Sequence, residues 1–171
     1  MIHVLQTLVL AAFAILVIVA ALRDVTSYTI PNKLSLALVA LFPVAALSLG
    51  LPLPLLGQHL AVGAAALVAG MAMFALRWIG GGDAKLFAAA ALWLGWPAIL
   101  TDVAVTGLAG GALAVVLLAL RSTHVRPFVP NGPAWFSRLA EPGENVPYGV
   151  AIAVGALAAF PLSPLMQHFG N

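Results

Sequence analysis

The chain has 171 residues, of which 63% are hydrophobic and only 7% are charged, whereas soluble domains carry about 25% charged residues. This composition excludes an ordinary soluble protein and predicts an all-α integral membrane protein with residues 1–171 as one domain. The net charge is only +2, which gives no indication of nucleic-acid binding. The absence of cysteine excludes disulfides and cysteine-ligated metals.

Six apolar segments have roughly the length that a membrane helix needs, about 20 residues. We predict transmembrane helices at about 4–22, 34–50, 59–78, 84–97, 101–120 and 148–166. The first segment is expected to be a retained span and not a cleaved signal peptide, because no Lys or Arg precedes it.

The basic residues predict the orientation of these six helices. All of them fall in the connections that face one side of the membrane: Arg23, Lys33, Arg77, Lys85, Arg121, Arg126 and Arg138. The opposite connections, around 51–58 and 97–101, contain no Lys or Arg. The positive-inside rule then places the basic side in the cytoplasm and both termini on the non-cytoplasmic side.

Residues 79–87, IGGGDAKLF, place an acidic residue at the start of a short span. From Asp83 to Trp96 the helix is about 20 Å long, compared with about 30 Å of hydrocarbon. We expect Trp93 and Trp96 to anchor at the outer interface, which would put Asp83 up to about 10 Å below the inner surface. An acidic residue at that depth is a candidate functional group, although an aspartate after a glycine turn also suits a helix cap.

A second acidic residue, Asp24, lies in the segment LRDVTSYTIPNKLS, in the connection expected after the first span. A compact bundle could bring Asp24 and Asp83 together on the basic side. Two facing carboxyl groups hold one shared proton, so that one activates water while the other hydrogen-bonds the scissile carbonyl. The glycines before Asp83 can adopt positive φ and admit an extended peptide. Each acid alone is also consistent with a solvated charge or a cap.

These motifs together resemble the type IV prepilin peptidases, which are membrane aspartic proteases with a G-x-G-D signature. Gly80 to Asp83 match that signature, Asp24 is followed seven residues later by Pro-Asn as in the family's first motif, and VPYGVAIAVGAL (146–157) resembles the entry to the last span. The resemblance implies that Asp24 and Asp83 are catalytic and that Gly80 and Gly82 are the motif glycines.

The resemblance also implies the substrate and the location. The expected partner is a pilin precursor, whose short basic leader is removed after a glycine at the cytoplasmic boundary of the bacterial inner membrane, without metal or cofactor. Large family members carry a cysteine-containing domain, linked to N-methylation, between the first two spans. This chain lacks that insertion and resembles the small branch that serves tight-adherence (Flp-type) pili, so no methyltransferase activity is expected.

Two alternatives remain open at this stage. The first is a small proton- or cation-coupled transporter that uses the same two aspartates, although no internal repeat supports it. The second is a related protease that acts on another substrate, such as an archaeal preflagellin or a membrane signal remnant. Lys33 and Lys85 are interpreted either as topology markers or as groups that support the dyad or a substrate terminus.

The remaining polar residues receive less specific predictions. Asp102 is expected to be exposed or to cap the helix after Thr101. His124, Glu141 and Glu144 match no metal-ligand spacing. The connection 121–147 is expected to rest on the membrane or to guide the substrate, with a short interfacial helix around Trp135 and Phe136.

Overall fold

The computed structural model describes residues 2–126 and 132–169, and the regular elements within these residues are all helical. The all-α prediction is therefore confirmed. Residues 127–131, within the expected connection 121–147, lie outside the described residues. The elements are α1 (Ile2–Ser27), α2 (Asn32–Ser48), α3 (Leu53–Ala75), α4 (Gly81–Leu94), α5 (Ala98–Arg121), α6 (Ala134–Leu139), α7 (Tyr148–Ala159), η2 (Phe160–Leu162) and α8 (Pro164–Gln167).

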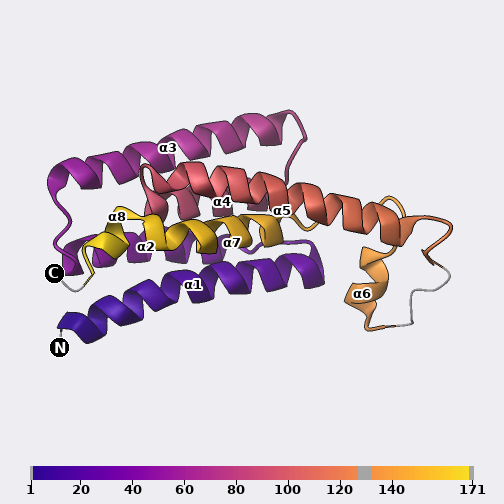
Figure 1. Cartoon of the computed structure of the whole chain (residues 1–171), viewed down its shortest axis with the longest axis horizontal. Coiled ribbons are helices and arrows are strands. Elements are labelled where there is room, and N and C mark those ends of the chain that lie inside the picture. Colours follow the sequence, from indigo (N-terminus) through magenta and orange to yellow (C-terminus); the bar gives the residue numbers. More distant parts are fainter. Residues whose placement is uncertain (1, 127–131, 170–171) are drawn as a thin grey trace.

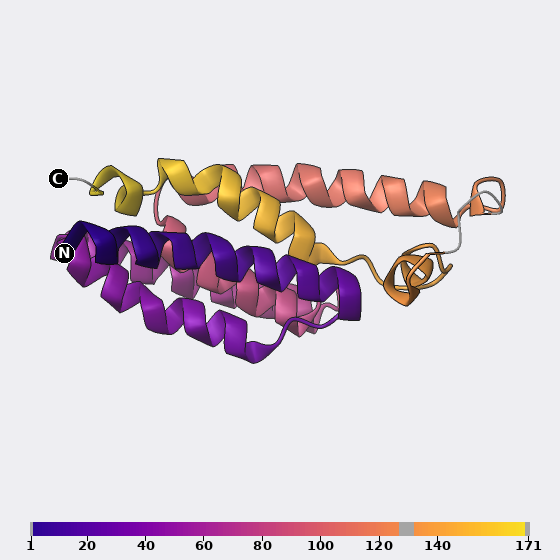
Figure 2. The same ribbon diagram turned by 90° about the horizontal axis from the view of Figure 1, so that it is seen from below.

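Among the residues that the structure describes, four helical segments are long and apolar enough to cross a membrane: α1, α3, α5 and the run from Tyr148 to Gln167. The α2 helix is apolar but has only 17 residues, and α4 has 14, or about 21 Å of helix. Six membrane crossings therefore remain a prediction. The long helices run side by side, with the start of α1 and the short α8 at one end of the bundle and α6 beyond the other end (Figures 1 and 2).

The end of the bundle near α6 is named here the basic end, because the helix ends and connections that carry the Lys and Arg residues meet there. At this end α1, α3 and α5 finish and α2, α4 and α7 begin (Figure 1). The chain therefore gathers at the basic end the two acid-bearing segments that the sequence singled out.

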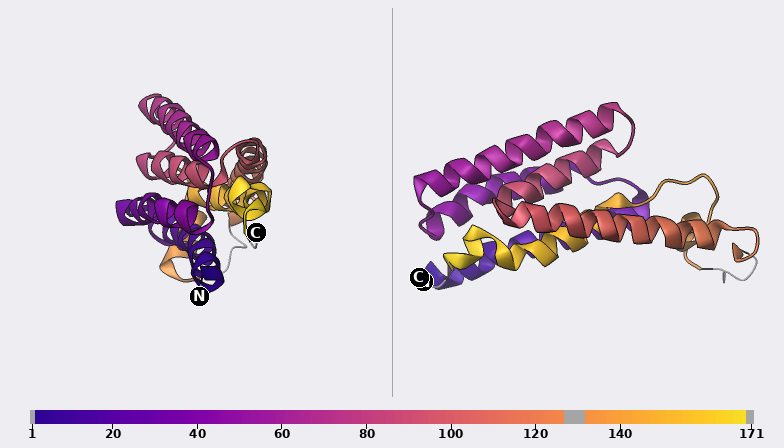
Figure 3. Two further views of the ribbon diagram at one scale, coloured as in Figure 1. Left: turned by 90° about the vertical axis from the view of Figure 1, so that its left-hand side faces the viewer. Right: turned by 45° about the horizontal axis from the view of Figure 1, so that its top comes forward.

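The short α4 helix packs against α2, α3 and α7, and an end-on view shows it between α3 and α2 (Figure 3). It is enclosed by α2, α3 and α7, and all its residues from Ala88 to Leu94 are buried. On one side, α3 packs against it through Gly63 and Gly70, which contact Leu92 and Ala84. Such small-residue faces allow two membrane helices to approach closely.

The prediction that Trp93 anchors at the outer interface was wrong. Its side chain is fully buried, its ring stacks on Phe13 with centroids 5.1 Å apart, and its Nε1–H donates to the carbonyl oxygen of Leu38 at 2.9 Å. Because neighbouring helices surround α4, Trp93 links α1, α2 and α4 and does not face lipid. Trp96, beyond the helix, is 49% exposed and suits an interfacial position.

The expectation that Asp102 is exposed or caps a helix was also wrong. Asp102 lies in the second turn of α5 and is fully buried, because α5 packs on α7 along this face. The Thr106 hydroxyl donates to its Oδ1 at 3.1 Å. The tight packing against Gly155 of α7 leaves no room there for a larger residue.

Candidate active site

Asp24 lies on the inward face of α1. The prediction that it lies in the connection after the first span was wrong. The helix continues beyond Leu22 to Ser27, and the hydroxyl groups of Thr26 and Ser27 donate to carbonyl oxygens one turn earlier at 2.7 Å. From Leu10 onwards, the buried residues of α1 follow one another at intervals of three or four: Leu10, Phe13, Val17, Ala20 and Asp24. The carboxyl group is therefore the last member of a core-facing stripe and is 6% exposed.

The buried Asp24 carboxyl is held by the backbone at the start of α7. The Gly149 N–H donates to its Oδ2 at 2.7 Å, which places a charge-assisted hydrogen bond in a buried site. A Cβ atom at position 149 would lie 2.9 Å from that oxygen and 2.8 Å from the Cδ1 of Ile30. Glycine is thus required at this position for the close approach of α7 to the carboxylate.

Asp83 occupies the first turn of α4. The Gly80 N–H donates to its Oδ2 at 3.1 Å, so the carboxylate satisfies a backbone donor that the helix leaves unpaired. Asp83 is half-buried and lies outside the four helices long enough to be spans. Burial raises the pKa of this carboxyl, while the Gly80 N–H acts in the opposite direction. The helix-capping and functional interpretations of Asp83 are therefore compatible.

One cavity of about 440 Å³ at the basic end contains both aspartates. The wall comes from the end of α1, the connection between α3 and α4, and the entry to α7; it is formed by Asp24, Tyr28, Phe74, Arg77, Trp78, Ile79, Gly80, Asp83, Asn145, Val146 and Tyr148. Folding thus brings the two predicted acids into one space that is part polar and part aromatic.

The three glycines before Asp83, Gly80 to Gly82, differ in their surroundings. Gly80 lines the cavity, with a φ of −72°, and none of the three has the positive φ that the sequence allowed. A Cβ atom on Gly82 would lie 3.1 Å from the Cβ of Ile30, so its bare backbone is covered by the chain itself. Only Gly80 therefore remains open to a ligand in the cavity.

The two lysines that the sequence associated with the aspartates lie elsewhere. Lys85 is on the other side of α4, where its ammonium group donates to the Oδ1 of Asn32 at 3.0 Å. It lines a separate groove between α2, α3 and α4. Lys33 is exposed on the first turn of α2. Neither lysine is part of the wall of the cavity that contains Asp24 and Asp83.

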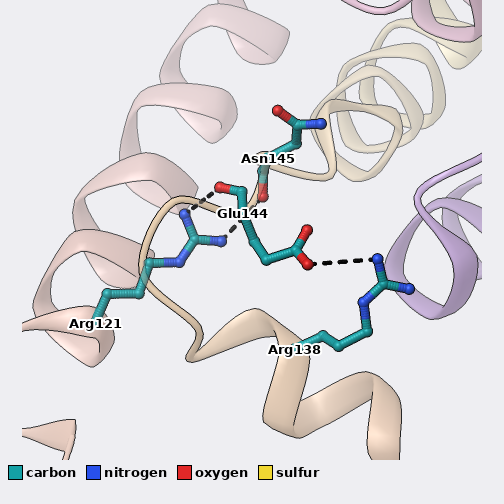
Figure 4. A network of polar contacts seen from close by, with 4 residues as sticks. All are labelled: Arg121, Arg138, Glu144 and Asn145. Atoms are coloured by element: carbon teal, nitrogen blue, oxygen red, sulfur yellow. Dashed lines mark hydrogen bonds and ion pairs between the residues drawn. The ribbon is translucent and has the colours of Figure 1, made fainter.

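Two arginines instead hold the segment that borders the cavity (Figure 4). Arg121, the last residue of α5, donates to the carbonyl oxygens of Leu139, Glu144 and Asn145 at 2.7–2.9 Å. Arg138 lies 3.5 Å from the Glu144 carboxylate, and its guanidinium is 5.0 Å from the centre of the Tyr28 ring. The segment 139–146 is thereby fixed against α5 and α1 at the rim.

The comparison with protein families provides independent evidence. Residues 11–115, more than half of the chain, match the model of the type IV leader peptidase family. The chain belongs to this family. Neither the curated proteins nor the solved structures gave a match.

The family match includes both aspartates of this leader peptidase but ends before α7. Gly149, which holds Asp24, lies outside it and was not assigned a role from the sequence, although the Pro-Tyr-Gly run had been noted as a family-like feature. In the sequence, Arg121 and Arg138 indicate only the orientation of the helices.

Within the described residues, no three potential ligand side chains lie close enough together to hold a metal ion.

Proposed function

We propose that this member of the leader peptidase family is an aspartic endopeptidase in which Asp24 and Asp83 form the catalytic dyad. The observation that carries the proposal is that one cavity contains both carboxyl groups, each with one oxygen bonded to a backbone N–H. The second oxygen of each carboxyl is then available for water or substrate. The family match favours a peptidase over the transporter alternative.

In the proposed reaction the pair shares one proton. The ionised carboxylate takes a proton from a water molecule as the water oxygen bonds to the scissile carbonyl carbon. The protonated partner donates a hydrogen bond to the carbonyl oxygen, which develops negative charge. When the C–N bond breaks, a proton from the dyad is transferred to the leaving amine. The titration belongs to the pair and not to either residue.

The proposed substrate is the precursor of a type IV, Flp-like pilin, cleaved between its basic leader and its hydrophobic helix. Support comes from the position of the cavity at the basic end, which the positive-inside rule places at the cytoplasmic face of the bacterial inner membrane. Phe74 and Trp78 add an apolar wall beside the carboxyl groups. Residues 28–31 alone join α1 to α2, which supports a peptidase without methyltransferase activity.

The dyad is tested by following the conversion of a co-expressed pilin precursor by gel shift. Asp24→Asn and Asp83→Asn each keep the side-chain shape but remove the ability to share the proton, and each should lower processing by at least about 100-fold. Asp102→Asn is the matched control, because Asp102 is also buried but lies in the α5–α7 interface. Normal processing by either dyad variant would reject the proposal, and ion transport without cleavage would support the transporter.

A further inference from the structure

A groove of about 490 Å³ lies between α2, α3 and α4, separate from the cavity that contains the aspartates. Each of the three helices contributes residues spaced i, i+3, i+4 and i+7, so that one face of each follows the groove for two turns. The floor is made of small, buried residues of α4, Ala88 and Ala89, while wall residues such as Leu36 and Leu67 are 65% and 41% exposed. The groove is therefore open along its side and apolar for most of its length.

The polar residues of the groove lie together at its basic end. They are Asn32 and Ser35 in the first turn of α2, and Lys85 at the start of the second turn of α4. The ammonium of Lys85 is bonded to the neutral amide of Asn32, and the described residues that line the groove include no carboxylate. A cation with a neutral partner at the mouth of an apolar groove favours a ligand with an anionic head and an apolar tail.

The length of the groove decides between the two apolar ligands that a membrane offers. From Lys85 to Leu92 the α4 floor spans about 10 Å, which is less than half of the hydrocarbon thickness of about 30 Å. A membrane-spanning helix of another protein would require an apolar surface through both leaflets. A lipid acyl chain lies within one leaflet and carries its head group at one end, as the groove carries Lys85 at its basic end.

We propose that this groove binds one anionic phospholipid, whose phosphate contacts Lys85 and Asn32 and whose acyl chain lies on Ala88 and Ala89. Basic pockets between transmembrane helices at the cytoplasmic side commonly bind such head groups. The lipid would fill the space between α2 and α3 and stabilise the positions of both helices against α4. The site is independent of the proposed peptidase reaction.

The head-group contact is tested by native mass spectrometry of the full chain with phosphatidylglycerol and phosphatidylcholine that carry identical acyl chains. The wild type should retain one phosphatidylglycerol in preference to phosphatidylcholine. Lys85→Gln should lower this preference about five-fold, as expected for one lysine–phosphate contact. Lys33→Gln is the matched control, because it removes the same charge from the first turn of α2, at a residue that does not line the groove. Equal effects of the two variants would overturn the proposal.

The acyl-chain contact is tested by filling the groove from its α3 wall. Ala64 is exposed and lines the groove, whereas its neighbour Ala65 is exposed outside it. Ala64→Phe should reduce the binding of both lipids, and Ala65→Phe should leave it unchanged. If Ala64→Phe keeps the lipid but loses cross-linking to an added apolar helical peptide, the ligand is a protein helix and the proposal is wrong. If Ala64→Phe fails to fold, the effect of Lys85→Gln on the lipid preference decides whether the proposal stands.

Discussion

Replacement of Gly149 by alanine tests whether the entry to α7 positions the Asp24 carboxyl. The new Cβ atom would lie 2.9 Å from the Oδ2 of Asp24, 3.0 Å from its Cβ and 2.8 Å from the Cδ1 of Ile30. Ordinary contacts between such atoms begin near 3.4 Å, so α7 or the carboxyl group must move by roughly 0.5 Å. The 2.7 Å hydrogen bond from the Gly149 N–H would lengthen or break.

Two physical effects set the size of the expected change. Overpacking of a well-filled site destabilises a protein by about 1–3 kcal/mol, which a bundle of this kind can tolerate. A displacement of up to 1 Å at a reacting group can lower a rate by about 100-fold. We therefore expect Gly149→Ala to accumulate in the membrane but to process the pilin precursor about 10- to 100-fold more slowly than the wild type.

The assay is the rate of precursor conversion at matched amounts of inserted protein, with helix content measured by circular dichroism. Gly107→Ala is the control, because a Cβ atom at this exposed position of α5 meets nothing within 4 Å. It should process the precursor at the wild-type rate. Equal rates for Gly149→Ala and Gly107→Ala would refute the argument that Gly149 positions Asp24.

Three further predictions follow from the packing and the polar contacts. Processing should fall as the pH rises and the pair of carboxyl groups loses its shared proton, and the repulsion between two like charges should place this fall above about pH 4, where an isolated aspartate ionises; a rate that keeps rising with pH would contradict a shared proton. Arg121→Gln removes three hydrogen bonds to the segment 139–145 and should speed the amide hydrogen exchange of this segment. Arg126→Gln removes only an exposed ion pair at 3.5 Å and should leave this exchange unchanged. Trp93→Phe should lower stability in thermal unfolding by about 1–3 kcal/mol through its lost buried hydrogen bond, while Trp78→Phe, at an exposed position, should have little effect.

The two acids illustrate how much of the site was readable from the sequence. A glycine run before Asp83 and a Pro-Asn pair after Asp24 identified both residues, because their spacing is a local pattern. The sequence did not predict that Asp24 lies within a helix and on its buried face. The α1 helix is apolar on all sides, so the pattern of residues does not distinguish the buried stripe from the lipid-facing one.

Trp93 and Asp102 show the limit of rules that use one residue at a time. Tryptophan favours the interface and aspartate favours water, yet both are fully buried here. Trp93 is enclosed because α1 and α2 pack against its side of α4, and Asp102 is enclosed because α5 packs on α7 and Thr106 provides a partner. These contacts depend on which helices are neighbours.

The sequence by itself determined that the protein is helical and membrane-embedded, which connections carry the positive charge, and which two aspartates matter for the proposed function. These features depend on composition and on short motifs, which act within a few residues. The tertiary structure decided that the aspartates share a cavity, that Gly149 holds one of them, and that Lys85 belongs to a different groove. Those relations join segments far apart in the chain, and the packing of α1 on α7 and of α4 on α2 and α3 fixes them.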